Sequence, residues 1–176
     1  MKLRGVVEGK NGWCGPAVIS SITGFPVDHV VETIRKVREN MGCEFSSRWV
    51  AGKDGEYYNQ DYRLPVKGMY DGEVRYTLQR YGYNLIPSVE NVPRYNKKGL
   101  RPTLAQWLKA RGDRNEMNLI SAGHHYQLVK GVKLVDNATK DPVFISKAPH
   151  RRRRMKKVYK VVKIESRKQL VYRKPK

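Results

Sequence analysis

Five residues whose side chains could perform nucleophilic chemistry occur in the order cysteine, histidine, carboxylate or amide. They are Cys14, His124, His125, Asp136 and Asn137. Cys14 precedes Gly-Pro-Ala and an apolar run, a pattern typical of a helix start. Unpaired backbone N–H groups and the positive end of the helix dipole lower the pKa of a thiol placed there. Because the thiolate is the reactive form, we expect Cys14 to be a nucleophile with a histidine as its base.

The setting of these residues resembles that of papain-like cysteine peptidases. The matching features are the Cys-Gly-Pro-Ala element that opens a helix, and a Gly-His strand followed by a tight turn and a strand ending in Asp136. The resemblance covers about residues 11–24 and 103–137, and it is closest to the small single-domain peptidases of bacteriophages and of bacteriocin-leader processing. It implies a papain-like α+β fold and a Cys-His-Asp triad that hydrolyses peptide bonds of a peptide or protein substrate without a metal or an organic cofactor. An amidase or transamidase would use the same groups.

Pairing across an expected hairpin distinguishes the two histidines. A two-residue turn at 130–131, where glycine accepts a positive φ, places His125 opposite Asp136 and His124 opposite Asn137, on opposite faces of the sheet. We favour His125 with Asp136, because a carboxylate both orients the imidazole and stabilises the imidazolium. The pair of His124 and Asn137 stays open as the alternative, since an amide can serve as the third member and a one-residue slip would exchange the faces.

The residue that would stabilise an oxyanion departs from the family pattern. Similar peptidases place a glutamine several residues before the nucleophile, whereas this chain has Glu8, which is an acceptor when ionised. Asn11 is therefore the candidate donor, beside the backbone N–H of Cys14. If Asn11 does not supply this hydrogen bond, the resemblance implies weak or absent activity.

Hydrophobic periodicity divides the chain into a helical first part and a second part rich in strands, which is an α+β arrangement. We expect N-terminal helices to carry the nucleophile and to pack on a C-terminal antiparallel sheet, with a long loop at 43–69. The expected domain covers 1–146, followed by a basic strand and tail over 147–176. Helices are expected at 14–23, 27–41 and 71–80 and from 103 to a stop at Gly112. Strands are expected at 83–89, 118–121, 126–129, 132–135, 143–145 and 156–164, the last at a sheet edge where lysines discourage pairing.

Positive charge is the second prominent feature. The chain carries 36 Lys and Arg against 16 Asp and Glu, a formal net charge of +20. Residues 147–176 hold much of this excess, and His150 is assigned to this tail. Such a segment attracts polyanions without sequence preference. We therefore expect nucleic acid to bind through Arg151, Arg152, Arg153, Arg154, Lys156 and Lys157.

The remaining composition excludes several classes of protein. No stretch is long and apolar enough for a membrane span, and no signal-peptide pattern follows Met1, so we expect a protein of the host cytoplasm or one packaged in a virion, with no membrane partner. Two cysteines, Cys14 and Cys43, favour neither a disulfide framework nor a zinc cluster. The alternative to a phage-encoded peptidase is a catalytically inactive, papain-like virion or packaging protein that binds nucleic acid and contacts other virion proteins.

Overall fold

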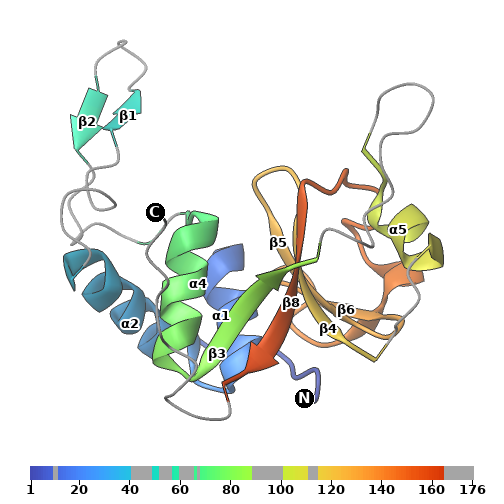
Figure 1. Cartoon of the computed structure of the whole chain (residues 1–176), viewed down its shortest axis with the longest axis horizontal. Helices are drawn as coiled ribbons and strands as arrows, with labels where there is room; N and C mark the ends of the chain where they lie inside the picture. Colours follow the sequence, from blue (N-terminus) through green and yellow to red (C-terminus); the bar gives the residue numbers. More distant parts are fainter. Residues whose placement is uncertain are drawn as a thin grey trace, which may run out of the picture.

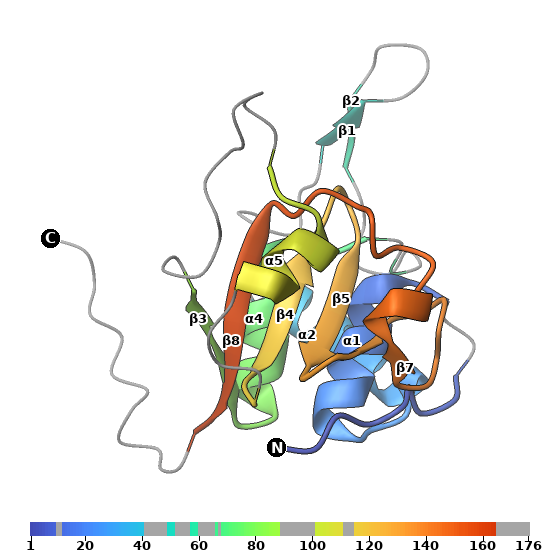
Figure 2. The same cartoon turned by 90° about the vertical axis from the view of Figure 1, so that its right-hand side faces the viewer.

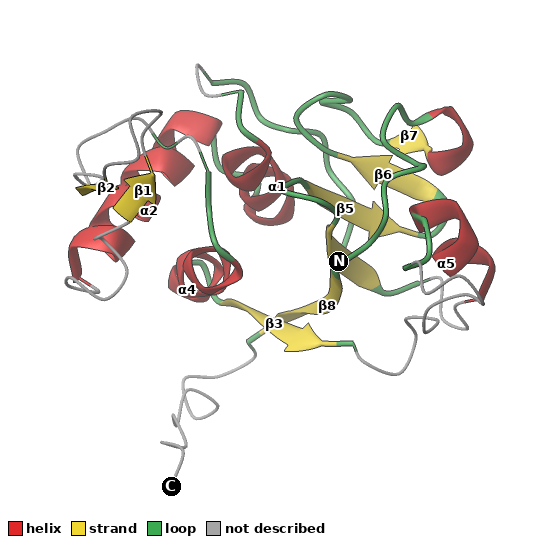
Figure 3. Cartoon of the chain, turned by 90° about the horizontal axis from the view of Figure 1, so that it is seen from above, coloured by secondary structure: helices red, strands yellow, loops and turns green. Residues whose placement is uncertain are grey.

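The structure is a computed structural model, and it describes residues 1–9, 12–40, 49–51, 57–59, 66, 68–88, 101–110 and 115–164. Within these residues an antiparallel sheet of six strands, in the order β3-β8-β4-β5-β6-β7, has helices on both faces (Figure 3). The helices are α1 Cys14–Thr23, α2 Val27–Asn40, α4 Asp71–Arg80, α5 Leu104–Ala110 and the 3₁₀ helix η1 Ile145–Lys147. The strands of this sheet are β3 Tyr83–Pro87, β4 Met117–Ser121, β5 Tyr126–Lys130, β6 Lys133–Val135, β7 Val143–Phe144 and β8 Lys157–Lys163. The α+β class expected from the sequence is confirmed.

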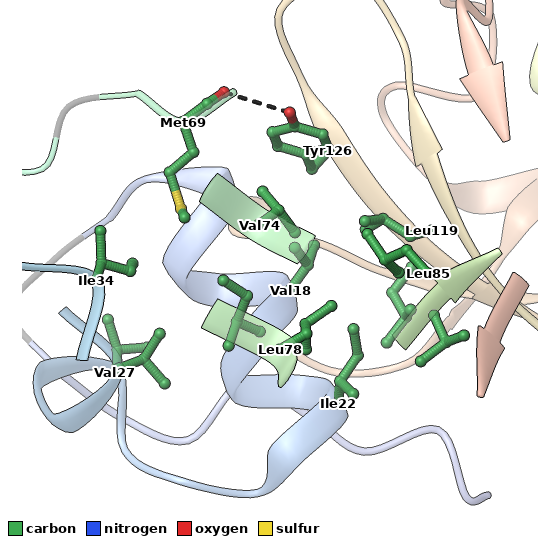
Figure 4. Close-up of a cluster of buried hydrophobic side chains, with 14 of the residues drawn as sticks. Val18, Ile22, Val27, Ile34, Met69, Val74, Leu78, Leu85, Leu119 and Tyr126 are labelled. Carbon is green, nitrogen blue, oxygen red and sulfur yellow. Dashed lines mark hydrogen bonds between the residues drawn. The ribbon is translucent and has the colours of Figure 1, made fainter. Parts of the chain in front are cut away.

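Alternation along the strands buries both faces of the sheet. Leu119 of β4 packs with Val18 of α1 and Leu78 of α4 (Figure 4), whereas its neighbour Ile120 packs with Trp107 of α5 on the other face. Figure 2 shows α5 in front of the strands, with α1, α2 and α4 behind them. Because successive side chains of a strand point to opposite faces, β4, β5, β6 and β8 each contribute to both apolar clusters. The sheet is therefore the middle layer of three.

Local sequence signals explain where α1 ends and where α5 begins. Gly24 follows α1 with φ 82°, a left-handed conformation that favours glycine, and its N–H donates to the carbonyl of Ser20 at 2.7 Å. At the start of α5, the hydroxyl of Thr103 accepts from the backbone N–H of Gln106, and the Gln106 side chain accepts from the N–H of Thr103 at 2.9 Å. This reciprocal pair is a capping box. The expected start of α5 and the expected bounds of α1 are confirmed.

A buried ion pair joins α2 to α4, and the same two side chains also bind the segment that precedes α4. Arg38 Nε donates to Glu73 Oε1 at 2.8 Å, and its Nη2 donates to the carbonyl of Gly68 at 2.8 Å. The other carboxylate oxygen of Glu73 accepts from the N–H of Tyr70 at 2.7 Å. With side chains 8% and 2% exposed, neither charge is solvated, so each depends on the other. The pair fixes residues 68–70, which line the cleft described below.

Two expectations about the strands are wrong. Strand β8 pairs with β3 on one side and β4 on the other, so it lies inside the sheet and not at an edge. Val158 and Val161 enter the two apolar clusters. The expectation of an edge strand rests on the lysines of β8, which alternate with these buried valines. The described part of 147–176 thus shares one sheet with earlier residues. The segment 43–69, expected to be a loop, contains two paired strands, β1 Trp49–Ala51 and β2 Tyr57–Asn59 (Figure 1).

Smaller differences concern element ends. The expected strand at 143–145 stops at Phe144, and Ile145 begins η1. Strand β3 ends at Pro87, although the N–H of Ser88 still donates to the carbonyl of Val158 at 2.9 Å, and Val89, the expected end, lies outside the described residues. The stop expected at Gly112 lies outside the described residues.

Across the described ranges, we find no helix whose length and apolar character would let it cross a membrane.

Candidate active site

Cys14 is the first residue of α1 and is half-buried. Trp13 before it is extended, and the first helical hydrogen bond runs from the N–H of Ala17 to the carbonyl of Trp13 at 3.2 Å. The N–H groups of Cys14 and Gly15 therefore precede the helical ladder, and Pro16 has none to lose. A Cβ added to Gly15 would lie 2.6 Å from Met69 Sδ, so glycine lets the helix start approach the 68–70 segment closely.

A tight turn places His125 at the start of β5. Gly123 and His124 both have positive φ, 52° and 61°, and the N–H of Ala122 donates to the carbonyl of His125 at 2.8 Å. Two positive φ values in a two-residue loop are the pattern of a type I′ turn, which suits the twist of a hairpin. His124 is consequently exposed on the turn, whereas His125 is buried, with 7% of its surface exposed.

The β5–β6 turn differs from the expected one, yet it leaves His125 and Asp136 together. Lys130 pairs with Lys133, so the turn residues are Gly131 and Val132 and not 130–131. Only Gly131, with φ 62°, has a positive φ, as a type II′ turn requires at its first central position. The pairing register of β5 and β6 therefore moves by two residues. Because side chains alternate between the two faces of the sheet with a period of two, each residue stays on its expected face. His125 Nε2 lies 2.9 Å from Asp136 Oδ2.

Asp136 is fully buried and accepts hydrogen bonds on both carboxylate oxygens. Its Oδ1 accepts from the backbone N–H groups of Ala138 and Thr139, each at 2.9 Å. Its Oδ2 faces His125, and the amide of Gln127 donates to the same oxygen at 3.4 Å. Burial raises the pKa of this carboxyl, but hydrogen bonds from His125 and from the backbone outweigh burial and hold the pKa well below its usual range. Asp136 is therefore an ionised, rigidly held acceptor.

The thiol and the imidazole shift each other's pKa toward the charged forms. Since Nε2 of His125 faces Asp136, its Nδ1 is the nitrogen available to Cys14, with which it hydrogen-bonds. Burial raises the pKa of the Cys14 thiol, yet the hydrogen bond with His125 and the N–H of Tyr126 lower it overall, below 9.0. For His125, burial lowers the pKa, but hydrogen bonds with Asp136 and Cys14 raise it to about 9. These opposite shifts favour a thiolate–imidazolium pair.

A cleft of about 560 Å³ opens over Cys14 and His125. Its walls include Trp13, Met69, Tyr70, Asp71, His124 and Lys156. On one side the Asp71 carboxylate accepts from the hydroxyls of Tyr126 at 2.6 Å and Tyr159 at 2.9 Å, and it pairs with Lys157 at 2.7 Å. Figure 4 shows the Tyr126 ring directed toward Met69. This network fixes the wall beside Cys14.

His150, which the sequence assigns only to a basic tail, is the residue that this reasoning missed. Its Nδ1 lies 3.3 Å from Asp136 Oδ2, and its ring meets the His125 ring edge-on, with centroids 4.6 Å apart. Among the described residues, the ligand atoms of His125, Asp136 and His150 lie close enough to hold a metal ion, all within 4.8 Å of one another. Each of these groups already has a hydrogen-bonding partner. No local motif marks His150, because only the fold brings it to Asp136.

The alternative pair is not brought together. Asn137 donates from Nδ2 to the carbonyl of Gly12 at 2.7 Å, which fixes the residue two positions before Cys14. His124 lines the cleft from the exposed turn. Asn11, the candidate oxyanion donor, and Cys43 lie outside the described residues.

The basic run is an anchored turn. Arg152, Arg153 and Arg154 are exposed. Arg154 also donates to the carbonyl of Arg101 at 2.6 Å, and Arg151 donates to the carbonyl of Ala148 at 3.1 Å. The chain then continues to Lys156 and Lys157, which line the cleft. The run predicted to bind nucleic acid is thus next to the candidate active site.

Comparison with known proteins adds no family assignment. No protein-family model matches this chain, and no curated protein matches it.

Proposed function

We propose that the protein is a cysteine peptidase of papain-like fold, with Cys14 as nucleophile, His125 as general base and acid, and Asp136 as the residue that orients the imidazole. The observation that carries the proposal is the chain of contacts from the Cys14 thiol through His125 to the buried Asp136 carboxylate. A structural cysteine in an apolar core would have a raised pKa. The lowered pKa of Cys14, at the end of a cleft, favours a reactive thiolate.

The proposed reaction proceeds in two steps. The Cys14 thiolate attacks a peptide carbonyl carbon, and the resulting oxyanion faces the N–H of Cys14 at the helix start. The His125 imidazolium protonates the leaving amine as the C–N bond breaks, which yields a thioester. Water, deprotonated by the now neutral His125, then attacks the thioester, and the acid product and the thiolate are released. Asn11 remains the sequence candidate for a second oxyanion donor.

The cleft supports a preference for acidic peptides. Lys157 is paired with Asp71, but Lys156 is exposed on the same wall, and no carboxylate of the described residues pairs with it. The uncompensated positive charge at the cleft therefore belongs to Lys156. We infer that a substrate with Asp or Glu beside the scissile bond gains a charge-assisted contact there.

A second candidate function is nucleic-acid binding by a phage protein that is inactive as a peptidase. The observation that favours it is the net charge of +20, together with exposed Arg152 and Arg153 beside the cleft. The two functions are compatible in one chain. Only a reactive Cys14 distinguishes the peptidase from the inactive, virion-associated or packaging protein.

Hydrolysis of a diverse peptide library, read by mass spectrometry, tests the proposal. The parent protein should release products with new termini, enriched for Asp or Glu near the cleavage point. Cys14→Ser should fold and yet release none, because a hydroxyl of nearly the same size is not ionised. Cys43→Ser is the matched control and should keep parent-like turnover. Parent-like turnover by Cys14→Ser would contradict the proposal.

A further inference from the structure

The carboxylate oxygen that His125 uses is shared with a second imidazole. Asp136 Oδ2 lies 2.9 Å from His125 Nε2 and 3.3 Å from His150 Nδ1. The carboxylate is fully buried, and the His150 side chain is 26% exposed, so His150 stands between Asp136 and solvent. The two rings meet at 72°, edge to face. His150 therefore touches both members of the pair that orients the base.

We propose that His150 is a positioning residue of the active site, which holds the Asp136 carboxylate and the His125 ring in the orientation that keeps Cys14 ionised. This inference rests on the proposed peptidase function. An ionised carboxylate only accepts hydrogen bonds, so the proton between the two side chains belongs to His150 Nδ1. That hydrogen bond also lowers the pKa of Asp136.

The backbone presents His150 on a turn that is fixed at both ends. Ala148 and Met155 are fully buried in the apolar cluster beneath α5. Between them, the N–H of Arg153 donates to the carbonyl of His150 at 3.0 Å, and the N–H of Met155 donates to Pro102 at 3.0 Å. A solvated basic tail would not need these anchors. The turn thus delivers one imidazole to Asp136 while it exposes arginines outward.

The hydrogen-bond pattern makes a specific set of variants informative. The Nδ1 of histidine and the Nδ2 of asparagine are the same number of bonds from Cβ, whereas the Nε2 of glutamine is one bond farther. His150→Asn therefore keeps the donor to Asp136, and His150→Gln and His150→Ala do not. His29→Ala is the matched control, because its imidazole stacks on Phe25, away from Asp136.

The readout is the rate of Cys14 alkylation by iodoacetamide against pH, located by peptide mass spectrometry. We expect His150→Ala and His150→Gln to slow alkylation at neutral pH about tenfold, the order of one hydrogen bond to a charged group. Their thiolate titration should move to higher pH. In His150→Asn the alkylation rate should stay within about threefold of the parent, and the thiolate titration should lie near that of the parent, because asparagine keeps the donor to Asp136.

Two results would overturn the inference. One is a parent-like pH profile in His150→Ala. The other is equal loss in all three variants with a lowered melting temperature, which would assign His150 to packing alone. Failure of the proposed function looks different, since Cys14 of the parent would then react no faster than an ordinary thiol. In that case the hydrogen bond itself is tested by NMR titration of His125, whose pKa should differ between His150→Ala and His150→Asn; equal values would overturn the inference.

Discussion

Replacing the Asp136 carboxylate by an amide should uncouple His125 from Cys14. In the parent, Oδ1 serves the N–H groups of Ala138 and Thr139 while Oδ2 serves His125. Asparagine has a single oxygen for these two tasks. If that oxygen stays with the two backbone donors, the amide NH₂ group faces His125 Nε2, and the imidazolium loses its acceptor. The loop keeps its hydrogen bonds, whereas His125, Gln127 and His150 lose the acceptor that they share.

The size of the effect follows from the shifts at the site. Burial lowers the pKa of His125, and the hydrogen bond with Asp136 is the largest single contribution among those that raise it to about 9. Without the carboxylate we expect this pKa to fall, which leaves less imidazolium above neutral pH. Cys14 then loses the cation that lowers its own pKa. The rate of Cys14 alkylation at pH 7 should therefore drop in Asp136→Asn by about tenfold or more, the order of one hydrogen bond to a charged group.

The assay is second-order alkylation of Cys14 by iodoacetamide from pH 5 to 10, read by peptide mass spectrometry. In the parent, the rate should reach half its plateau below pH 9.0, because the pKa of Cys14 is lowered from that value. Asp136→Asn should move the midpoint upward. Asp141→Asn, which alters an exposed carboxylate, is the control and should match the parent. An unchanged midpoint in a folded Asp136→Asn protein would refute the coupling of Asp136 to Cys14 through His125.

Four further predictions concern other parts of the molecule. His125→Ala should lower peptide hydrolysis at least ~10²-fold, as for loss of a general base, whereas His124→Asn should keep most activity; the reverse result would transfer the role to His124. Arg38→Ala should lower the unfolding free energy by about 3 to 5 kcal/mol in urea titrations, because it leaves a buried carboxylate unpaired, and a loss below about 1 kcal/mol would contradict this. Since the pKa of Asp136 is lowered, its contribution to stability is present above pH 3.8 and is lost as the pH falls toward the folded-state value. Acid should thus lower the urea midpoint more in the parent than in Asp136→Asn. An equal decrease of the urea midpoint with pH in the two proteins would contradict this. Replacing Arg151–Arg154 by serine should weaken binding to duplex DNA. In the parent, the slope of log affinity against log salt concentration should be about −5 if six phosphates are engaged. Binding that is unchanged in the variant, or insensitive to salt in the parent, would exclude this role.

Local signals sufficed for the helices and for the helix start that carries Cys14. The Gly-Pro-Ala element and Gly24 determine the two ends of α1 through short-range hydrogen bonding, which does not depend on the rest of the fold. The proximity of His125 and Asp136 was also predictable, although the predicted turn was wrong. A register error of two residues keeps side chains on the same face, whereas an error of one would have separated them.

Long-range pairing was beyond the reach of the sequence. The lysines in β8 predict an edge strand, but β8 pairs with β3 on one side and β4 on the other, and Val158 and Val161 are buried on its opposite faces. The approach of His150 to Asp136 depends on that placement, because the turn at 148–155 leads directly into β8. A run of arginines next to His150 favoured a solvated tail. No periodic pattern distinguishes such a tail from an anchored turn.

Covalent labelling by a peptidyl electrophile tests the central claim most directly, because it requires the cleft, the thiolate and the imidazolium together. A peptidyl acyloxymethyl ketone with an acidic residue beside the electrophile should label the parent protein at Cys14 and not at Cys43, as located by peptide mass spectrometry. Labelling should be lost in Cys14→Ser and strongly slowed in His125→Ala. Labelling of Cys43 alone, or labelling of Cys14 at the same rate with and without His125, would contradict the assignment of Cys14 and His125 as a catalytic pair.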